Sequence, residues 1–182
     1  MKSLENGHNG ISSQKKLAFL TALCLFFAAV EFALPKPVPF LRLGLSNVPV
    51  ILSFFILSGG QTLLLIVLKI LVQNLISGSL FSYTVLFSIA GSFSSGLLML
   101  VLFRMFYRRK VLSLVGISLA GSLINALSQG AVSYLIVFNE NTKYILPFLL
   151  ISSFITGLLL GFFAEYFVRN SVWFKKVRGE QC

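Results

Sequence analysis

Two pairs of polar side chains interrupt apolar runs, and within each pair the spacing is four residues. Lys69 is followed by Gln73, and Asn125 is followed by Gln129. Residues four apart share one face of a helix. Ionisable and amide groups at membrane depth are costly, so they indicate either a functional site or structural hydrogen bonds between helices. The two pairs are therefore candidates for binding a polar solute, with helix-to-helix bonding as the alternative.

The second pair belongs to a longer polar seam that small and hydroxyl-bearing residues continue in both directions. Its other members follow at spacings of three and four: Ser118, Gly121, Ser122, Ser128 and Ser133. On an otherwise apolar helix such a face must look into the protein rather than into lipid. Within the seam, only Asn125 and Gln129 have enough donors and acceptors to recognise a ligand.

The segment 34–47, LPKPVPFLRLGLSN, separates two apolar runs and differs from both. Its three prolines fix φ and remove N–H donors, which predicts an extended path. Gly44 then predicts a turn, and Lys36 and Arg42 add positive charge. We expect neither a membrane-spanning helix nor an ordinary linker here.

A helix is predicted to begin directly after this turn. Ser46 or Asn47 is the expected N-cap, and Pro49 falls in the first turn, where its missing donor costs nothing. A helix N-terminus attracts anions, so together with Arg42 it forms a candidate anion-recognition element. A structured loop whose cations meet lipid headgroups is the alternative. Glu31, near the end of the first apolar run, is the expected counter-ion of Lys69 or Arg42, either beside a ligand or as a purely structural ion pair.

The composition is that of a polytopic membrane protein. Hydrophobic residues make up 57% and charged residues 11% of the chain, and the mean hydropathy is +0.92. Fifteen Lys and Arg oppose five acidic residues, but the cations flank apolar runs, which excludes nucleic-acid binding as their explanation. The single His and two distant Cys form no metal or redox motif, so no cofactor is expected.

The apolar runs predict an all-α membrane bundle of six transmembrane helices. Residues 1–14 are expected to form a disordered cytoplasmic tail, 15–170 the six-helix membrane domain, and 171–182 a basic cytoplasmic tail. The second span is the weakest, because residues 48–58 are too few to cross about 30 Å of hydrocarbon unless residues 40–45 extend it. The expected spans are residues 17–34, 48–58, 61–76, 83–103, 112–138 and 145–168.

The distribution of cations predicts the orientation. Most Lys and Arg residues lie on the side of the two termini, whereas Lys36, Arg42 and Lys143 lie on the other side. By the positive-inside rule, both termini are expected in the cytoplasm and the protein in the cell's inner (plasma) membrane. Small residues four apart, such as Ala18 with Ala22, allow helices to approach closely, within the bundle or against a partner.

Several of these motifs together resemble the Gx transporter family, whose members are also labelled heptaprenyl diphosphate synthase component I. The similarity covers residues 17–168, and its most specific part is RLGLSN within the segment 34–47. The residues that carry it are Glu31, this segment, Lys69, Gln73, Gly78, Phe81, Ser82, Ser88, Gly91, Asn125 and Gln129.

That family is similar in architecture to the S components of energy-coupling-factor transporters. The resemblance implies six helices, both termini inside, a pocket near the outer face, and a small, vitamin-like solute. It also implies a transmembrane coupling protein and two ATPase subunits as partners. In S components an A-x3-A motif on the first helix docks on the coupling protein, and Ala18 with Ala22 is the matching pair.

Three functions are consistent with the sequence. The first is a solute-binding transport subunit without an ATP site of its own, since no P-loop is present. Its expected binding residues are Arg42, Asn47, Lys69, Gln73, Asn125 and Gln129 with Glu31, and their cations favour an anionic ligand. The second is a membrane component of heptaprenyl diphosphate synthesis that binds or anchors. Catalysis is not expected of it, because magnesium-dependent ionisation needs clustered carboxylates and this chain has no Asp. The third is a membrane scaffold without a ligand.

Overall fold

A computed structural model describes residues 2–33, 44–78, 81–107, 111–138, 142–171 and 174, with the backbone alone for 2–13 and 137–138. Within these residues every regular element is helical, as predicted. Two helices end in π-helical turns: α4 continues into η1 and α5 into η2. In chain order the elements are α1 Lys2–Ala33, α2 Asn47–Ile56, α3 Gly59–Ile76, α4 Thr84–Leu102, η1 Phe103–Tyr107, α5 Leu114–Val132, η2 Ser133–Phe138 and α6 Thr142–Asn170.

Of the six α-helices within the described residues, five are long and apolar enough to cross a membrane, and α2 is the exception. The chain is therefore a multi-pass membrane protein built as a bundle of six helices. With ten residues, α2 rises only about 15 Å. It begins at Asn47, so the predicted outward extension through residues 40–45 contributes no described helix; residues 40–43 lie outside the described part of the chain.

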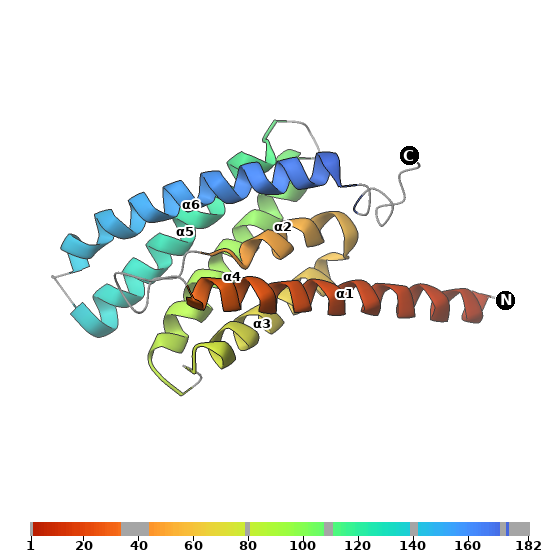
Figure 1. Cartoon of the computed structure of the whole chain (residues 1–182), viewed down its shortest axis with the longest axis horizontal. Helices are drawn as coiled ribbons and strands as arrows, with labels where there is room; N and C mark the ends of the chain where they lie inside the picture. Colours follow the sequence, from red (N-terminus) through yellow and green to blue (C-terminus); the bar gives the residue numbers. More distant parts are fainter. Residues whose placement is uncertain are drawn as a thin grey trace.

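The helices form two packed groups around α2 (Figure 1). The pair α5 and α6 lies side by side, α4 packs along α5, and α1 packs along α3. The start of α1 and the end of α6 lie at the same end of the bundle, which we call the terminal end. Every residue from Asn47 to Phe54 in α2 is buried, so this short helix is enclosed by the long ones.

Small residues explain how closely α5 and α6 approach. A Cβ added at Gly161 would lie 2.7 Å from the Cα of Val115, and one at Gly157 would lie 3.2 Å from the Cα of Leu119. Only residues without a side chain allow two helix backbones this close. Gly157 and Gly161, which are also small residues four apart, therefore serve packing within the chain.

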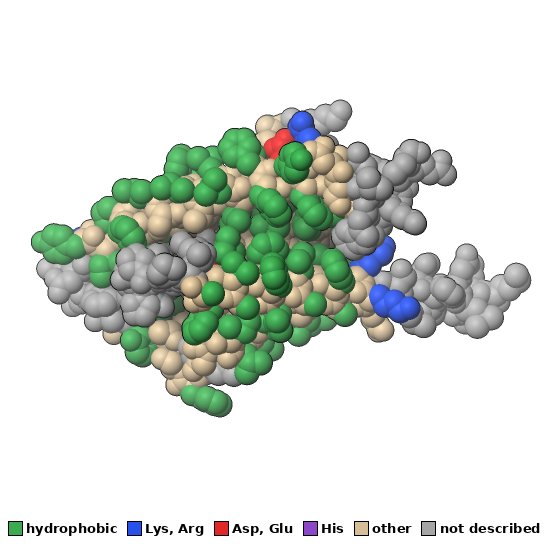
Figure 2. Space-filling model, in the orientation of Figure 1, with side chains coloured by type: hydrophobic (Ala, Val, Ile, Leu, Met, Phe, Trp, Pro, Cys, Tyr) green, Lys and Arg blue, Asp and Glu red, His purple; other side chains and the backbone are tan. Residues whose placement is uncertain are grey.

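Hydrophobic side chains are spread over the spans on the face shown in Figure 2. Large side chains such as Phe26, Leu71 and Phe162 are exposed on α1, α3 and α6. In water such a surface would be unstable, but in lipid it faces a solvent of its own polarity.

The first helix starts earlier than the sequence predicts. The expected disordered tail ends at residue 14, whereas α1 runs from Lys2 to Ala33. No proline interrupts residues 1–33, so the helix of the first span can extend backwards by adding one hydrogen bond per residue.

Candidate functional site

The turn that precedes α2 forms as predicted at Gly44. Gly44 has φ +82°, a conformation that favours glycine. The amide N–H of Asn47 donates to the carbonyl of Gly44 at 2.8 Å, and that of Val48 donates to the carbonyl of Leu45 at 3.2 Å. Ser46 is the N-cap residue, but its side chain makes no capping hydrogen bond.

This turn corrects the predicted anion site at the helix start. The expectation was that free N–H groups at the N-terminus of α2 would face a ligand. Instead, Asn47 and Val48 use theirs within the turn, and Pro49 has none. Recognition at this end of α2 must therefore depend mainly on side chains.

Glu31 ties the first helix to the turn. Its carboxylate is almost fully buried, at 1% exposure, and Oε2 accepts a hydrogen bond from the N–H of Leu45 at 3.1 Å. Nearby, the thiol of Cys24 lies 3.9 Å from the carbonyl oxygen of Ser46. Of the two cations expected to accompany Glu31, Lys69 is described below, and Arg42 lies outside the described residues, as does Lys36.

Lys69 reaches from α3 to the start of α2. Its ammonium is buried at 3% exposure and donates to Oδ1 of Asn47. Lys69 follows Gly59, the first residue of α3, by ten positions, which places it about 15 Å along the helix, near its middle. The predicted charge at membrane depth is therefore present and bound to one of the predicted site residues.

Asn125 of α5 meets the same turn from the opposite side. A Cβ added at Gly44 would lie 2.9 Å from Nδ2 of Asn47 and 4.0 Å from Nδ2 of Asn125. On α4, a Cβ at Gly91 would overlap Oδ1 of Asn125 and lie 3.3 Å from Cγ of Gln129. The Asn125 amide thus sits between two glycines. We call Asn47, Lys69, Asn125 and Gln129, which the turn, α3 and α5 bring together beside α4, the polar cluster.

Two amides of this region have oxygens without a hydrogen-bond partner. They are Oε1 of Gln73 and Oε1 of Gln129, and both residues are buried at 5% and 1% exposure. Next to Gln73, Asn74 accepts a hydrogen bond from the hydroxyl of Ser88 at 2.9 Å, which fixes α3 against α4. Buried polar atoms usually have a partner, so these orphaned oxygens suit a site that a ligand completes.

Three serines of the seam follow the other predicted alternative and bond to neighbouring helices, whereas Ser122 donates to the carbonyl of Leu119 within α5. Ser118 donates to the carbonyl of Gly157 at 2.9 Å, and the hydroxyl of Ser128 lies 2.7 Å from that of Ser94. The hydroxyl of Ser133 lies 3.4 Å from that of Thr142, the first residue of α6. The seam therefore divides: three of its hydroxyls connect α5 and η2 to α4 and α6, while its two amides lie at the polar cluster.

Ala18 and Ala22 both lie exposed on α1. Within the described residues they are not used to pack α1 against its neighbours. The predicted docking pair is thus accessible from outside the bundle.

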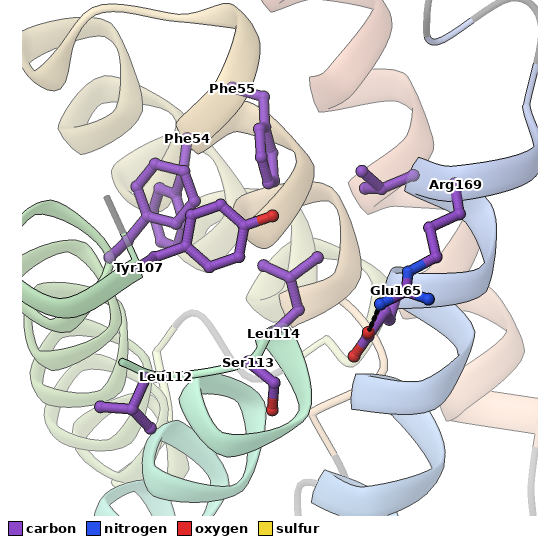
Figure 3. Close-up of a pocket in the computed structure, with 10 residues that line it drawn as sticks. Phe54, Phe55, Tyr107, Leu112, Ser113, Leu114, Glu165 and Arg169 are labelled. Atoms are coloured by element: carbon purple, nitrogen blue, oxygen red, sulfur yellow. Dashed lines mark hydrogen bonds and ion pairs between the residues drawn. The ribbon is translucent and has the colours of Figure 1, made fainter. Parts of the chain in front are cut away.

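A cavity of about 640 Å³ at the terminal end was not predicted (Figure 3). Residues from four separate helices or helix ends line it, including Phe54, Tyr107, Leu114, Glu165 and Arg169. Glu165 and Arg169 form an ion pair at 2.7 Å, as expected from their spacing. No periodic pattern in the sequence links four distant segments, so only their packing creates the cavity. It shares no lining residue with the polar cluster.

A family model described as heptaprenyl diphosphate synthase component I matches residues 20–167 of the chain. The match includes every residue of the polar cluster and most of the membrane-spanning part. Comparison with curated proteins gives no match, and comparison with solved structures gives none either.

Proposed function

The chain belongs to the heptaprenyl diphosphate synthase component I family, and from this premise we propose that it is the solute-binding subunit of a small-molecule uptake transporter. The observation that carries the proposal is the convergence of Asn47, Lys69 and Asn125 on the turn at Gly44, with Gln129 next to Asn125 where α5 meets Gly91 of α4. Three helices and a turn are needed to bring these side chains together, although a bundle can be held together without any of them.

In this proposal, Lys69 and Asn47 of the polar cluster act on an anionic group of the solute, and the amides of Gln129 and of the nearby Gln73 act on its donors. The Lys69 ammonium attracts an anionic group of the solute, and Asn47 holds the ammonium in place. The orphaned oxygens of Gln73 and Gln129 accept hydrogen bonds from N–H or O–H groups of the solute. Because water is excluded from the interior, each of these interactions is stronger than it would be at a surface.

The remaining parts of the proposal concern orientation and energy. Both termini are cytoplasmic, so the turn at Gly44 faces the exterior, and Arg42 adds a second cation at the entrance. Since the chain carries no P-loop, energy comes from a separate module of a transmembrane coupling protein and ATPase subunits. This module docks on the exposed Ala18 and Ala22 of α1.

The experiment measures thermal stabilisation of the purified protein by a panel of small carboxylate- and phosphate-bearing solutes, with neutral and cationic solutes alongside. Lys69→Met and Asn125→Ala are compared with Leu71→Ala, which changes an exposed, lipid-facing residue of α3. Lys69→Met removes a hydrogen bond between a charged group and the solute. The affinity for an anionic solute should therefore fall roughly 10- to 100-fold. The control variant is expected to bind as the wild type does.

Two results would count against this function. One is the absence of stabilisation by any solute, together with native mass spectra that show no co-purifying small molecule. The other is an affinity for an identified solute that stays unchanged in both cluster variants.

A second candidate follows from the family's description, which names a component of heptaprenyl diphosphate synthesis. In this role the chain would bind a prenyl diphosphate or anchor a soluble synthase. It would not catalyse, because the chain has no Asp and its five Glu are scattered. Affinity purification from gently solubilised membranes separates the two: recovery of a soluble prenyl synthase favours this role, and recovery of ATPase subunits favours the transporter.

A further inference from the structure

An apolar groove of about 430 Å³ runs between α1 and α6, with α2 as its floor. Figure 2 shows hydrophobic side chains gathered over the face between these two helices. The groove shares no lining residue with the polar cluster. Its lining consists of Phe19, Leu20, Leu23, Phe27, Val48, Leu52, Ile56, Phe163, Phe167, Ser171 and Phe174.

The walls of the groove suit a flexible chain better than a helix. Phe19 and Phe163 are about half exposed, at 48% and 47%, so the groove opens toward the bilayer. Helices that pack in a membrane meet through small residues, but Ala18 and Ala22 do not line the groove. Large aromatic walls instead leave a slot that a hydrocarbon chain can fill.

At its terminal end the groove is lined by Phe174, and a lysine of α1 lies on the same helix face nearby. Phe174 is buried at 1% exposure, and its N–H donates to Oγ of Ser171 at 3.2 Å. The centroid of its ring lies 6.0 Å from that of Phe167. On α1, Lys16 precedes Leu20 by four residues and Leu23 by seven, so it shares their face one turn nearer the terminal end. None of the described lining residues is acidic.

We propose that this groove binds one acyl chain of an anionic phospholipid whose phosphate is held by Lys16. Lys16 lies at the start of the spanning part of α1, which begins at Gln14, and therefore at the depth of lipid headgroups. A basic residue beside a membrane-spanning helix attracts anionic headgroups. The chain then extends from the headgroup along Leu20 and Leu23 toward the middle of the bilayer.

The test uses native mass spectrometry of the full chain, released from nanodiscs that contain equal amounts of phosphatidylglycerol and phosphatidylcholine. The wild type is expected to retain one phosphatidylglycerol. Leu23→Trp fills the groove and should abolish retention, whereas Leu25→Trp, at an exposed position of α1 outside the groove, should not. Lys16→Gln should reduce the preference for phosphatidylglycerol over phosphatidylcholine about fivefold, and Lys143→Gln, at the other end of the bundle, should leave it unchanged.

Three outcomes overturn the proposal. The first is equal lipid retention in Leu23→Trp and Leu25→Trp, provided both variants unfold at the wild-type temperature. The second is displacement of phosphatidylglycerol by an equimolar amount of geranylgeranyl diphosphate, which would assign the groove to a prenyl diphosphate. The third is a stoichiometric protein subunit that crosslinks to position 23 in place of lipid.

Discussion

Replacing Gly91 with alanine adds a methyl group at the point where α4 meets the two amides of α5. The new Cβ would overlap Oδ1 of Asn125 and lie 3.3 Å from Cγ of Gln129. On its other side, Nδ2 of Asn125 lies 4.0 Å from the point that a Cβ at Gly44 would occupy, which limits how far the amide can move away. We therefore expect Gly91→Ala to destabilise the protein.

The magnitude follows from two opposing contributions. Overpacking a tight interior costs roughly 1–3 kcal/mol, whereas alanine in place of glycine within a helix gains about 1 kcal/mol. The net loss is thus about 0–2 kcal/mol. Gly60→Ala in α3 is the matched control, since a Cβ there would meet nothing within 4 Å. The difference between the two variants removes most of the propensity gain and leaves a packing cost of roughly 1–3 kcal/mol.

The assay is equilibrium unfolding of the purified protein in mixed micelles by titration with sodium dodecyl sulfate, followed by circular dichroism. Gly91→Ala is measured alone and in the Asn125→Ala background. Once the Asn125 amide is removed, the added methyl group has space, so most of the packing cost should disappear in the double variant. Such non-additivity is the signature of two groups in contact.

Two results would refute this reasoning. If Gly91→Ala is as stable as Gly60→Ala, the amide does not lie against α4. If the penalty is the same with and without the Asn125 side chain, the overlap involves another group.

Three further predictions concern packing, orientation and docking. Gly161→Ala places a Cβ 2.7 Å from the Cα of Val115. Because a backbone atom cannot rotate away, the variant should lose roughly 1–3 kcal/mol of stability in the same unfolding assay. A stability equal to that of the wild type would contradict the α5–α6 packing. The proposed orientation is tested in a background free of cysteine. Lys143→Cys should react with a membrane-impermeant maleimide in intact cells, whereas Arg169→Cys should react only after lysis. The reverse pattern would show the opposite orientation. Ala22→Leu, on the exposed side of α1, should reduce co-purification of a coupling subunit without lowering the unfolding temperature, and unchanged recovery would remove this helix face from the docking surface.

The sequence predicts the helices well because long apolar runs are a strong signal. The predicted turn at Gly44 is confirmed, because its positive φ is one that glycine adopts readily. Ser46, the N-cap of α2, is one of the two predicted N-caps. The sequence also predicts that the second span is too short to cross the membrane without help from the preceding residues. What periodicity could not predict is that α2 is buried on all sides, because burial depends on how the long helices pack around it.

The candidate site was predicted in part. The polar groups of Asn47, Lys69 and Asn125 are brought to one turn, which their spacing within separate helices could suggest but not establish. Spacing alone also could not divide the α5 seam between structural serines and clustered amides. That division depends on what α4 and α6 present opposite each residue, such as the carbonyl of Gly157 opposite Ser118.

The start of α2 shows where local rules fail. A helix N-terminus is expected to offer free donors, but the tight turn at Gly44 consumes those of Asn47 and Val48. The hydrogen bond from the N–H of Leu45 to Glu31 joins residues from two different segments, and no local pattern identifies such a contact.

The length and enclosure of α2 have a consequence for how the protein is made. A ten-residue helix is too short to act as an independent insertion signal for the translocon, which recognises stretches of about 20 apolar residues. Its polar first residue, Asn47, would also be poorly solvated by lipid until the Lys69 side chain of α3, which donates to it, arrives. Biogenesis of this protein should therefore hold α2 at the membrane surface or in the translocon until α3 has been synthesised, so that the two enter together as a hairpin.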